Sequence, residues 1–136
     1  TMGVDRAAAA LAPFDEKRYM HQACASGGAS GEHVFYEDLP DLLDAARAGR
    51  APGEEWRVHF HVPVFLDEIG ELGTTNGEIA EAVRTARDLH GTRHFEVETY
   101  AWNVLPDEHR PEDLGAGIAR ELAWVREHCG DEEGVA

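Results

Sequence analysis

The sequence predicts an α/β fold made of parallel βαβα units, amounting to about half of a (β/α)8 barrel. The order of elements is the first observation behind this prediction. A strand-like run at 56–65 is followed by a helix-like run, a second strand-like run at 94–101 and a last helix-like run. This alternation with short connections is typical of parallel βαβ architecture, in which crossovers are right-handed. Length is the second observation: 136 residues cannot form a complete barrel of about 250.

The first fifty residues predict two helices. Residues 4–12 are rich in alanine and are followed by Pro13, which cannot continue a helix. Further on, Asp38 is a good N-cap for a second helix. Gly49 then provides a C-terminal stop for that helix.

The stretch between these helices predicts a loop. Residues 25–31 are dominated by glycine, serine and alanine, a composition typical of flexible connections. The segments 18–21 and 33–36 on either side could pair as a hairpin. We therefore expect the glycine-rich stretch to join these two arms.

The second half carries the stronger signals. The run 56–65 is rich in β-branched and aromatic residues, as is typical of strands. Thr75 and Glu78 have the spacing of a capping box, and Gly91 predicts the end of the helix that follows. That helix is expected to bury four apolar residues at helical spacing: Ile79, Val83, Ala86 and Leu89.

The last helix is predicted to begin at Pro111, which suits the first helical position. Its expected apolar stripe consists of Leu114, Ile118, Leu122 and Val125. We expect one domain over 1–136. It would comprise a lead-in over 1–50, two βα units over 51–129 and an acidic tail over 130–136.

Charge and composition exclude several classes of function. The chain has 27 Asp and Glu against 12 Lys and Arg, a formal net charge of −15. Such an excess disfavours nucleic acids and anionic membrane surfaces, which both require clustered cations. No apolar run reaches the roughly 18 residues of a membrane span, so no membrane insertion is expected. Two cysteines without metal-binding spacing favour a reduced, cytoplasmic protein.

The two predicted strands each place polar side chains on one face. In the first strand these are Arg57, His59 and His61; in the second they are His94, Glu96, Glu98 and Tyr100. A sheet covered by helices on both faces should be apolar on both. A buried glutamate would cost several kcal/mol unless it were paired. The pattern therefore favours a polar barrel interior with active groups at the carboxyl ends of the strands.

These polar rows contain the best candidates for chemistry. His61 and Glu98 lie furthest along their strands, and His59 and Glu96 lie about one layer deeper. Imidazole and carboxylate together are good ligands for Zn²⁺, Mn²⁺ or Fe²⁺. A carboxylate can also act as a base beside a carbonyl or hydroxyl. The alternative is a buried polar network without any chemical function.

Three further residues are candidates for a substrate pocket. Tyr100 and Trp102 follow the second predicted strand and could form a pocket wall, although a packing role explains them equally well. His21 could reach the mouth of the same pocket.

The runs 58–65, 73–75 and 96–106 resemble the metabolite traffic protein EboE family. That family belongs to the xylose-isomerase-like, or sugar phosphate isomerase/epimerase-like, TIM barrels. The segments 19–22 and 36–40 fit the part of the family that precedes its penultimate strand. The resemblance implies the C-terminal half of a TIM barrel, in which the two predicted strands are the last two.

The resemblance also implies a divalent metal, Zn, Mn or Mg, at the strand ends. Glu98 best matches the family's glutamate on the final strand, with Glu96 as the second choice. His61 would contact the metal or the substrate. His59 completes the candidate ligands. Asn103 stands where the family is expected to have an aspartate.

Together these observations favour an isomerase or epimerase acting on a small, polar, sugar-like or secondary metabolite. The alternative is a non-catalytic component that binds or traffics a metabolite with the same fold. A third interpretation is an assembly fragment without any site. Because half a barrel leaves strand edges unpaired, we expect a homodimer or pairing with an N-terminal half-barrel.

Overall fold

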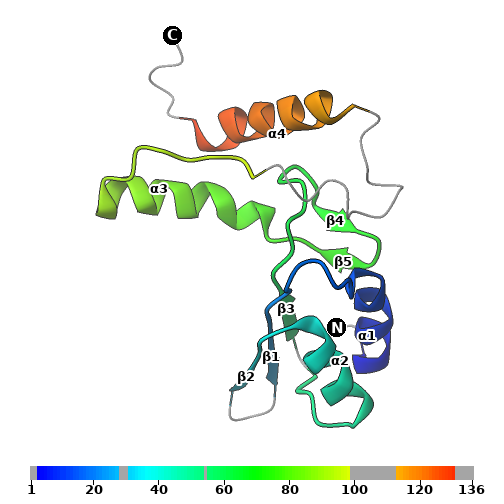
Figure 1. Ribbon diagram of the computed structural model, residues 1–136. Helices are drawn as coiled ribbons and strands as arrows, with labels where there is room; N and C mark the ends of the chain where they lie inside the picture. Colours follow the sequence, from blue (N-terminus) through cyan, green and yellow to red (C-terminus); the bar gives the residue numbers. More distant parts are fainter. Residues whose placement is uncertain (1–2, 28–30, 54, 99–112, 131–136) are drawn as a thin grey trace. The chain divides into compact units, whose positions relative to one another are not determined.

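The computed structural model describes residues 3–27, 31–53, 55–98 and 113–130, which form a mixed α/β structure (Figure 1). The α/β class predicted from the sequence is therefore confirmed. The chain divides into two compact units, Thr1–Phe60 and His61–Ala136, called unit 1 and unit 2 below. The boundary falls inside the run that the sequence predicts as one strand over 56–65.

Unit 1 combines two α-helices with a three-stranded antiparallel sheet of order β2-β1-β3. Its elements are α1 (Val4–Leu11), the 3-10 helix η1 (Ala12–Phe14), β1 (Ala23–Gly27), β2 (Glu32–Tyr36), α2 (Leu39–Arg47) and β3 (Glu55–Val58). Both predicted helices of the lead-in are thus confirmed. The hairpin is confirmed only in its second arm, because β2 pairs with β1 and not with residues 18–21.

The central strand of unit 1, β1, overlaps the stretch 25–31 that is predicted to be a loop. In β1, Ala25 lies opposite Val34 on one side and Trp56 on the other. Ala23, Ala25 and Gly27 alternate with more exposed residues and are buried. Their small side chains suit a strand that packs closely beneath a helix, and α2 contacts β1. The composition of this segment predicts a loop, because small residues are common in loops as well as in closely packed strands.

The core of unit 1 forms where α1, α2 and the sheet meet. Its fully or nearly fully buried side chains include Leu11, Ala25, Leu39, Leu42 and Leu43. As predicted, Asp38 caps α2, and its Oδ1 accepts a hydrogen bond of 2.9 Å from the Leu39 N–H. The same oxygen accepts the His21 N–H at 2.8 Å. Asp38 therefore ties the segment before β1 to the start of α2.

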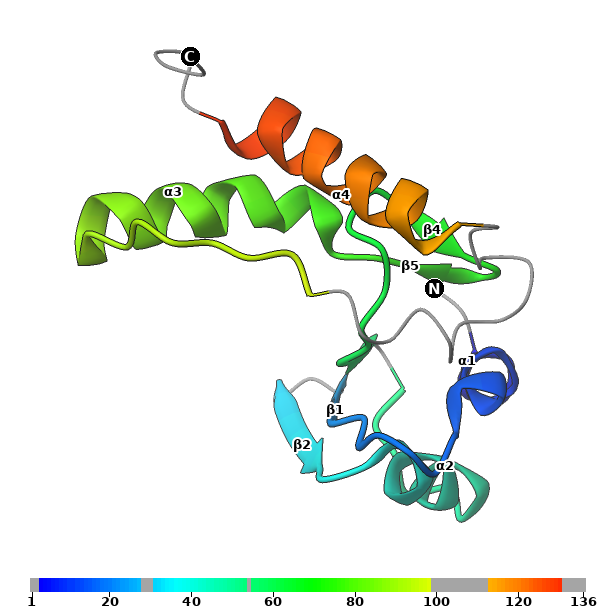
Figure 2. The ribbon, with the colours of Figure 1, turned by 45° about the horizontal axis from the view of Figure 1, so that its top comes forward.

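Unit 2 consists of a short hairpin and two longer helices (Figure 2). Its elements are β4 (Glu68–Ile69), β5 (Leu72–Gly73), the 3-10 helix η2 (Asn76–Glu78), α3 (Ile79–His90) and α4 (Leu114–Cys129). The helices α3 and α4 pack against each other. In Figures 1 and 2, residues 91–98 run back alongside α3.

The parallel strands expected from the sequence are not present in the described residues. The run 56–65 is a strand only up to Val58, where β3 pairs antiparallel to β1. Residues 94–98 have no regular secondary structure, and 99–101 lie outside the described residues. An extended run needs a neighbouring strand to satisfy its backbone groups. The hairpin of β1 and β2 supplies one locally for β3, and nothing comparable lies beside 94–98 in the described part. The barrel itself stays a prediction.

The predicted burial of the two later helices is wrong. Gly91 ends α3 in the left-handed region at φ 64°, as predicted, but Thr75 makes no capping bond. No residue of α3 is buried, and Leu89 is 74% exposed. In α4 the buried residues are Gly117, Glu121 and Cys129, whereas Leu114 and Leu122 of the expected stripe are exposed. Their apolar side chains lack the sheet that the prediction assumed they would cover.

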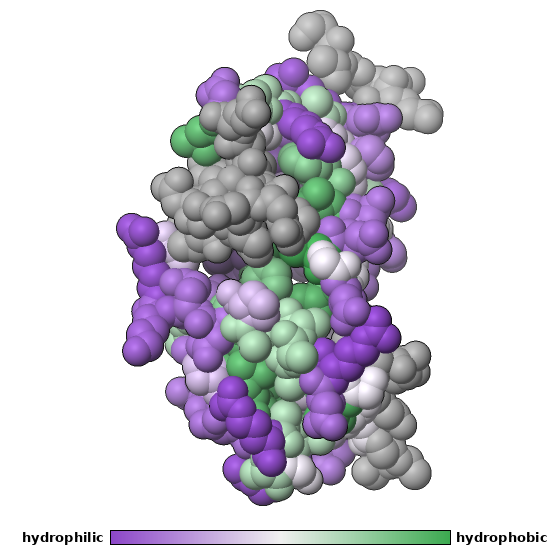
Figure 3. Space-filling model, turned by 90° about the vertical axis from the view of Figure 1, so that its right-hand side faces the viewer, coloured by the Kyte–Doolittle hydropathy of each residue, from purple (hydrophilic) through white to green (hydrophobic). Residues whose placement is uncertain are grey.

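Apolar side chains are visible on the molecular surface in Figure 3, among strongly hydrophilic ones. Single exposed apolar residues are common in folded proteins. Within the part of the chain that the structure describes, none of the helices has the length and apolar character needed to span a bilayer.

Candidate functional site

His61 and Glu98 lie together in unit 2. Nδ1 of His61 is 2.7 Å from Oε2 of Glu98. The imidazole side chain is 22% exposed and the carboxylate side chain 57% exposed. The two residues are 37 positions apart, so the contact depends on the tertiary structure. The structure thus brings together the two residues that the sequence placed first as candidates.

The segment that carries His61 is attached to α4. The Val64 N–H donates to Oε1 of Glu121 at 3.2 Å, and Pro63 beside it is buried. The guanidinium of Arg120 lies 3.9 Å from the centre of the Phe65 ring. A cation this close to an aromatic face is attracted by the ring's quadrupole. These contacts fix the residues just after His61 relative to the helix.

The segment that carries Glu98 is attached to α3. After Gly91 reverses the chain, Phe95 lies under the guanidinium of Arg87, 5.5 Å from its ring centre. Since α3 packs against α4, the two segments that bear His61 and Glu98 are both anchored to one helix pair. Loops held by packed helices can position reactive side chains in this way.

The His61–Glu98 pair is suited to proton transfer. A carboxylate beside an imidazole nitrogen fixes the orientation of the ring. Because Glu98 is more than half exposed, the ion pair contributes little to stability, with values of about 0–1 kcal/mol typical of such pairs. The same exposure leaves the carboxylate accessible to a small molecule from solvent.

The structure describes some of the other candidate residues and not all of them. Glu96 is exposed on the segment that carries Glu98. His59 belongs to unit 1, is exposed, and donates its backbone N–H to the Gln22 carbonyl at 2.8 Å. Tyr100 and Trp102 lie outside the described residues.

His21 occupies the interior of unit 1. Its side chain is buried and its ring centre lies 5.0 Å from that of Phe60 at an angle of 60°. Its backbone N–H is held by Asp38. These contacts give His21 a clear packing role within unit 1.

The pair also has suitable chemistry for binding a divalent metal, since one nitrogen and one carboxylate oxygen meet at a single point. A catalytic zinc site has three protein ligands. Across residues 3–27, 31–53, 55–98 and 113–130, no three His, Cys, Asp or Glu side chains form a cluster able to hold a metal ion. The described residues therefore do not make a complete metal site on their own.

Glu121 is a residue of this region that the sequence analysis missed. Its carboxylate is 2% exposed and accepts the Val64 N–H. Its spacing of four from Gly117 and eight from Cys129 places all three on one face of α4. This face overlaps the apolar stripe expected from the sequence, and a carboxylate beside such a stripe carries no sequence signal that it is buried.

Comparison of the whole chain with known protein families, with curated proteins and with solved structures finds no match in any of the three.

Proposed function

We propose that the chain is the C-terminal portion of a xylose-isomerase-like TIM-barrel protein with isomerase- or epimerase-like activity. Its substrate would be a small polar metabolite, sugar-like or from secondary metabolism. The observation that carries the proposal is the 2.7 Å contact between His61 and Glu98. The resemblance to the metabolite traffic protein EboE family supports the same assignment through Glu98.

Isomerisation and epimerisation next to a carbonyl both begin by removing a proton from carbon. The Glu98 carboxylate would accept that proton, and the electron pair of the C–H bond would move into the carbonyl to form an enolate. The His61 imidazole would orient Glu98 and donate a proton to the enolate oxygen. For isomerisation, Glu98 would return its proton to the former carbonyl carbon while the hydroxyl on the adjacent carbon gives its proton to His61 and becomes the new carbonyl. For epimerisation, a proton from water would reach the opposite face of the original carbon, the enol hydroxyl would return its proton to His61, and Glu98 would release its proton to water.

A divalent ion, Zn, Mn or Mg, fits the same proposal. Glu98 and His61 would provide two ligands, and the ion would stabilise negative charge on a substrate oxygen. At least one further protein ligand is required, because the described residues hold no preformed group of three; it would come from the remaining residues, from another chain, or from a described side chain that moves to the ion. Glu96 and His59 stay candidates for that role.

The proposed barrel also needs a partner. Helix α3 has an apolar stripe but no buried residue, which is the expected state of a βα-unit helix without its sheet. A second copy of the chain or an N-terminal half-barrel would supply the missing strands. We also propose a cytoplasmic location, which the free thiols of Cys24 and Cys129 support.

Proton exchange at carbon provides the direct test. The chain, alone and with Mn²⁺, would be incubated in D2O with a panel of aldoses, ketoses and their phosphates. Deuterium at the carbon next to the carbonyl, detected by proton NMR, is the expected result. Glu98→Gln should abolish incorporation, because an amide cannot accept the proton. Glu81→Gln is the matched control, since Glu81 is an exposed residue of α3.

Zn²⁺ titration by calorimetry tests the metal part separately. Loss of one ligand in Glu98→Gln or His61→Asn should weaken binding at least about tenfold. Glu81→Gln should leave it unchanged. Equal affinities for all four proteins would contradict the ligand assignment. Saturable binding of a sugar without deuterium incorporation would favour the alternative, a non-catalytic metabolite-binding or trafficking protein.

A further inference from the structure

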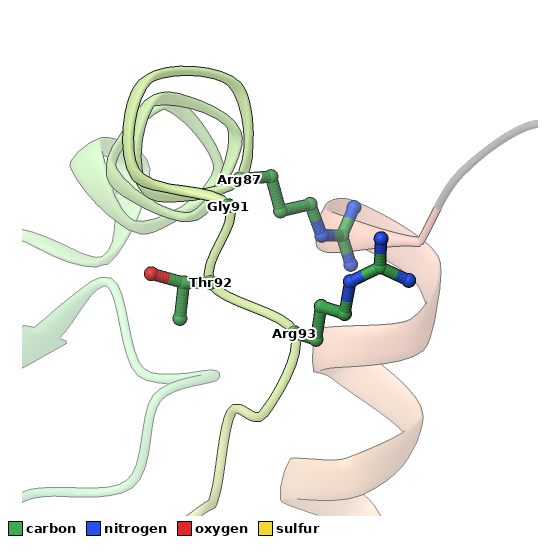
Figure 4. A pocket seen from close by; sticks show the side chains of 4 residues that line it. All are labelled: Arg87, Gly91, Thr92 and Arg93. Carbon is green, nitrogen blue, oxygen red and sulfur yellow. The ribbon is translucent and has the colours of Figure 1, made fainter.

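A pocket opens at the C-terminal end of α3, and neither His61 nor Glu98 lines it. It has a volume of about 370 Å³ and is lined by Arg87, Gly91, Thr92 and Arg93. Figure 4 shows the side chains of Arg87 and Arg93 extending on the same side of the chain, with their guanidinium groups beside each other. The Thr92 side chain points to the other side. Two positive groups therefore meet in one open pocket.

The local sequence explains why the two arginines meet. Gly91 adopts φ 64°, a conformation that glycine accepts without steric cost. Its N–H donates to the Arg87 carbonyl at 3.0 Å, and the Thr92 N–H donates to the Ala86 carbonyl at 3.2 Å. These two bonds form the usual closing turn of a helix. The turn reverses the chain and returns Arg93 to the side of Arg87.

Two helix ends make the arginine pair possible. The C-termini of α3 and α4 lie at the same end of their helix pair in Figures 1 and 2. Each helix C-terminus carries roughly half a negative charge, which attracts the arginine side chains. Stacking on Phe95 further fixes Arg87. Arg87 is thus held in place before any ligand arrives, and such preorganisation lowers the entropy cost of binding.

The charge of the whole chain makes this local arrangement informative. With a formal net charge of −15, the protein repels anions in general. Saturable binding of an anion would therefore require a local group of cations. Two guanidinium groups suit a phosphate dianion best, because each can donate two parallel hydrogen bonds to its oxygens.

We propose that this pocket binds the phosphate group of a small phosphorylated metabolite. Its volume is within the range of ligand pockets and exceeds what a phosphate alone would fill, so part of the attached molecule can enter too. Arg93 is five residues from Glu98, a span of up to about 17 Å, and 91–98 runs along α3. The phosphate site shares no lining residue with the His61–Glu98 pair and does not depend on the function proposed for that pair.

Titration with inorganic phosphate and with glycerol 3-phosphate, followed by calorimetry, tests the proposal. We expect saturable binding of both, with the ester at least as tight. Arg93→Gln should weaken binding about tenfold, the loss expected for a hydrogen-bonded charge. Arg93→Lys keeps the charge but loses the planar fork, so it should fall between the wild type and Arg93→Gln.

Arg84→Gln is the matched control. It removes the same charge one turn earlier on α3, and Arg84 does not line the pocket. We expect its affinity to stay within about twofold of the wild type. Arg87→Gln should weaken binding as Arg93→Gln does, but Arg87 also stacks on Phe95. Circular dichroism of each variant therefore confirms that the helices are intact.

Three results would overturn the proposal. One is the absence of saturable phosphate binding by the wild type. Another is an equal loss of affinity in Arg84→Gln and Arg93→Gln, which would indicate a general effect of charge. The third is tighter binding of citrate than of glycerol 3-phosphate, which would assign the pocket to carboxylates.

Discussion

Helix α2 of unit 1 and helix α3 of unit 2 are similarly amphipathic but differ greatly in burial. In unit 1, five residues of α2 are buried where this helix packs against the sheet and against α1. In unit 2, α3 buries none. The buried apolar side chains in the described part of unit 2 are Pro63, Ile69 and Cys129. An apolar stripe thus predicts where a helix forms, but its burial depends on whether a sheet or second helix is present to receive it.

The largest expected difference between the units concerns leucine truncation. Leu42 is fully buried in α2, so Leu42→Ala should reduce the free energy of unfolding by about 2–5 kcal/mol. Leu89→Ala makes the same chemical change on the exposed α3 side chain and should cost less than about 0.5 kcal/mol. Urea unfolding followed by circular dichroism measures both. Similar losses in the two variants would mean that α3 is covered in solution, as a dimer would require.

A smaller effect is expected at the buried carboxylate of unit 2. Glu121→Ala removes the acceptor of the Val64 N–H and should cost about 1–3 kcal/mol. The Val64 amide should then exchange its hydrogen roughly 5 to 150 times faster. Glu121→Gln retains an acceptor oxygen and should change the exchange rate less than about fivefold. Hydrogen exchange of the Val64 amide, measured by NMR in the two variants, tests this prediction. Equally accelerated exchange in both variants would contradict the hydrogen bond between Val64 and Glu121.

The smallest expected effect is a difference in alkylation rate between the two thiols, Cys24 and Cys129. Burial raises the pKa of Cys129 above its ordinary value, and the guanidinium of Arg87 opposes this only in part. The neutral Cys129 thiol therefore stabilises the folded protein at pH values below the pKa that the thiol has in the unfolded chain. This stabilisation is lost as the pH rises through the higher pKa that the thiol has in the folded protein. At pH 8, alkylation of Cys129 should be about tenfold slower than that of the more exposed Cys24. The variants Cys24→Ser and Cys129→Ser isolate each thiol for mass spectrometry.

Urea provides the control for the thiol comparison. In the unfolded chain both cysteines are exposed, so their alkylation rates should become equal. Equal rates in the native protein would show that α4 does not bury Cys129.

Local signals in the sequence were reliable where one residue determines the backbone. Asp38 caps α2, and Gly91 ends α3, because a capping oxygen and a positive φ act within one turn. The helix regions 4–12 and 79–89 follow from the same local rules. For the candidate site, strand alternation selected His61 and Glu98, which do meet, although by a route other than paired parallel strands.

Signals that depend on distant partners were less reliable. The small residues of β1 look like a loop until two neighbouring strands and α2 surround them. The run 94–98 has strand composition without a described strand beside it. Glu121 was missed because its burial depends on Val64, 57 positions earlier. The arginine pair required the chain reversal at Gly91 to bring Arg93 back to the helix.

The sheet of unit 1 has a consequence for handling the protein. In the order β2-β1-β3, both outer strands present a free edge within the described residues, and Phe35 on β2 is well exposed. Such edges can recruit strands from other molecules. At neutral pH the mutual repulsion of chains that each carry a net charge of −15 opposes this contact. Acidification removes that repulsion as carboxylates take up protons, so purification and storage at neutral pH and low salt should keep the chains dispersed.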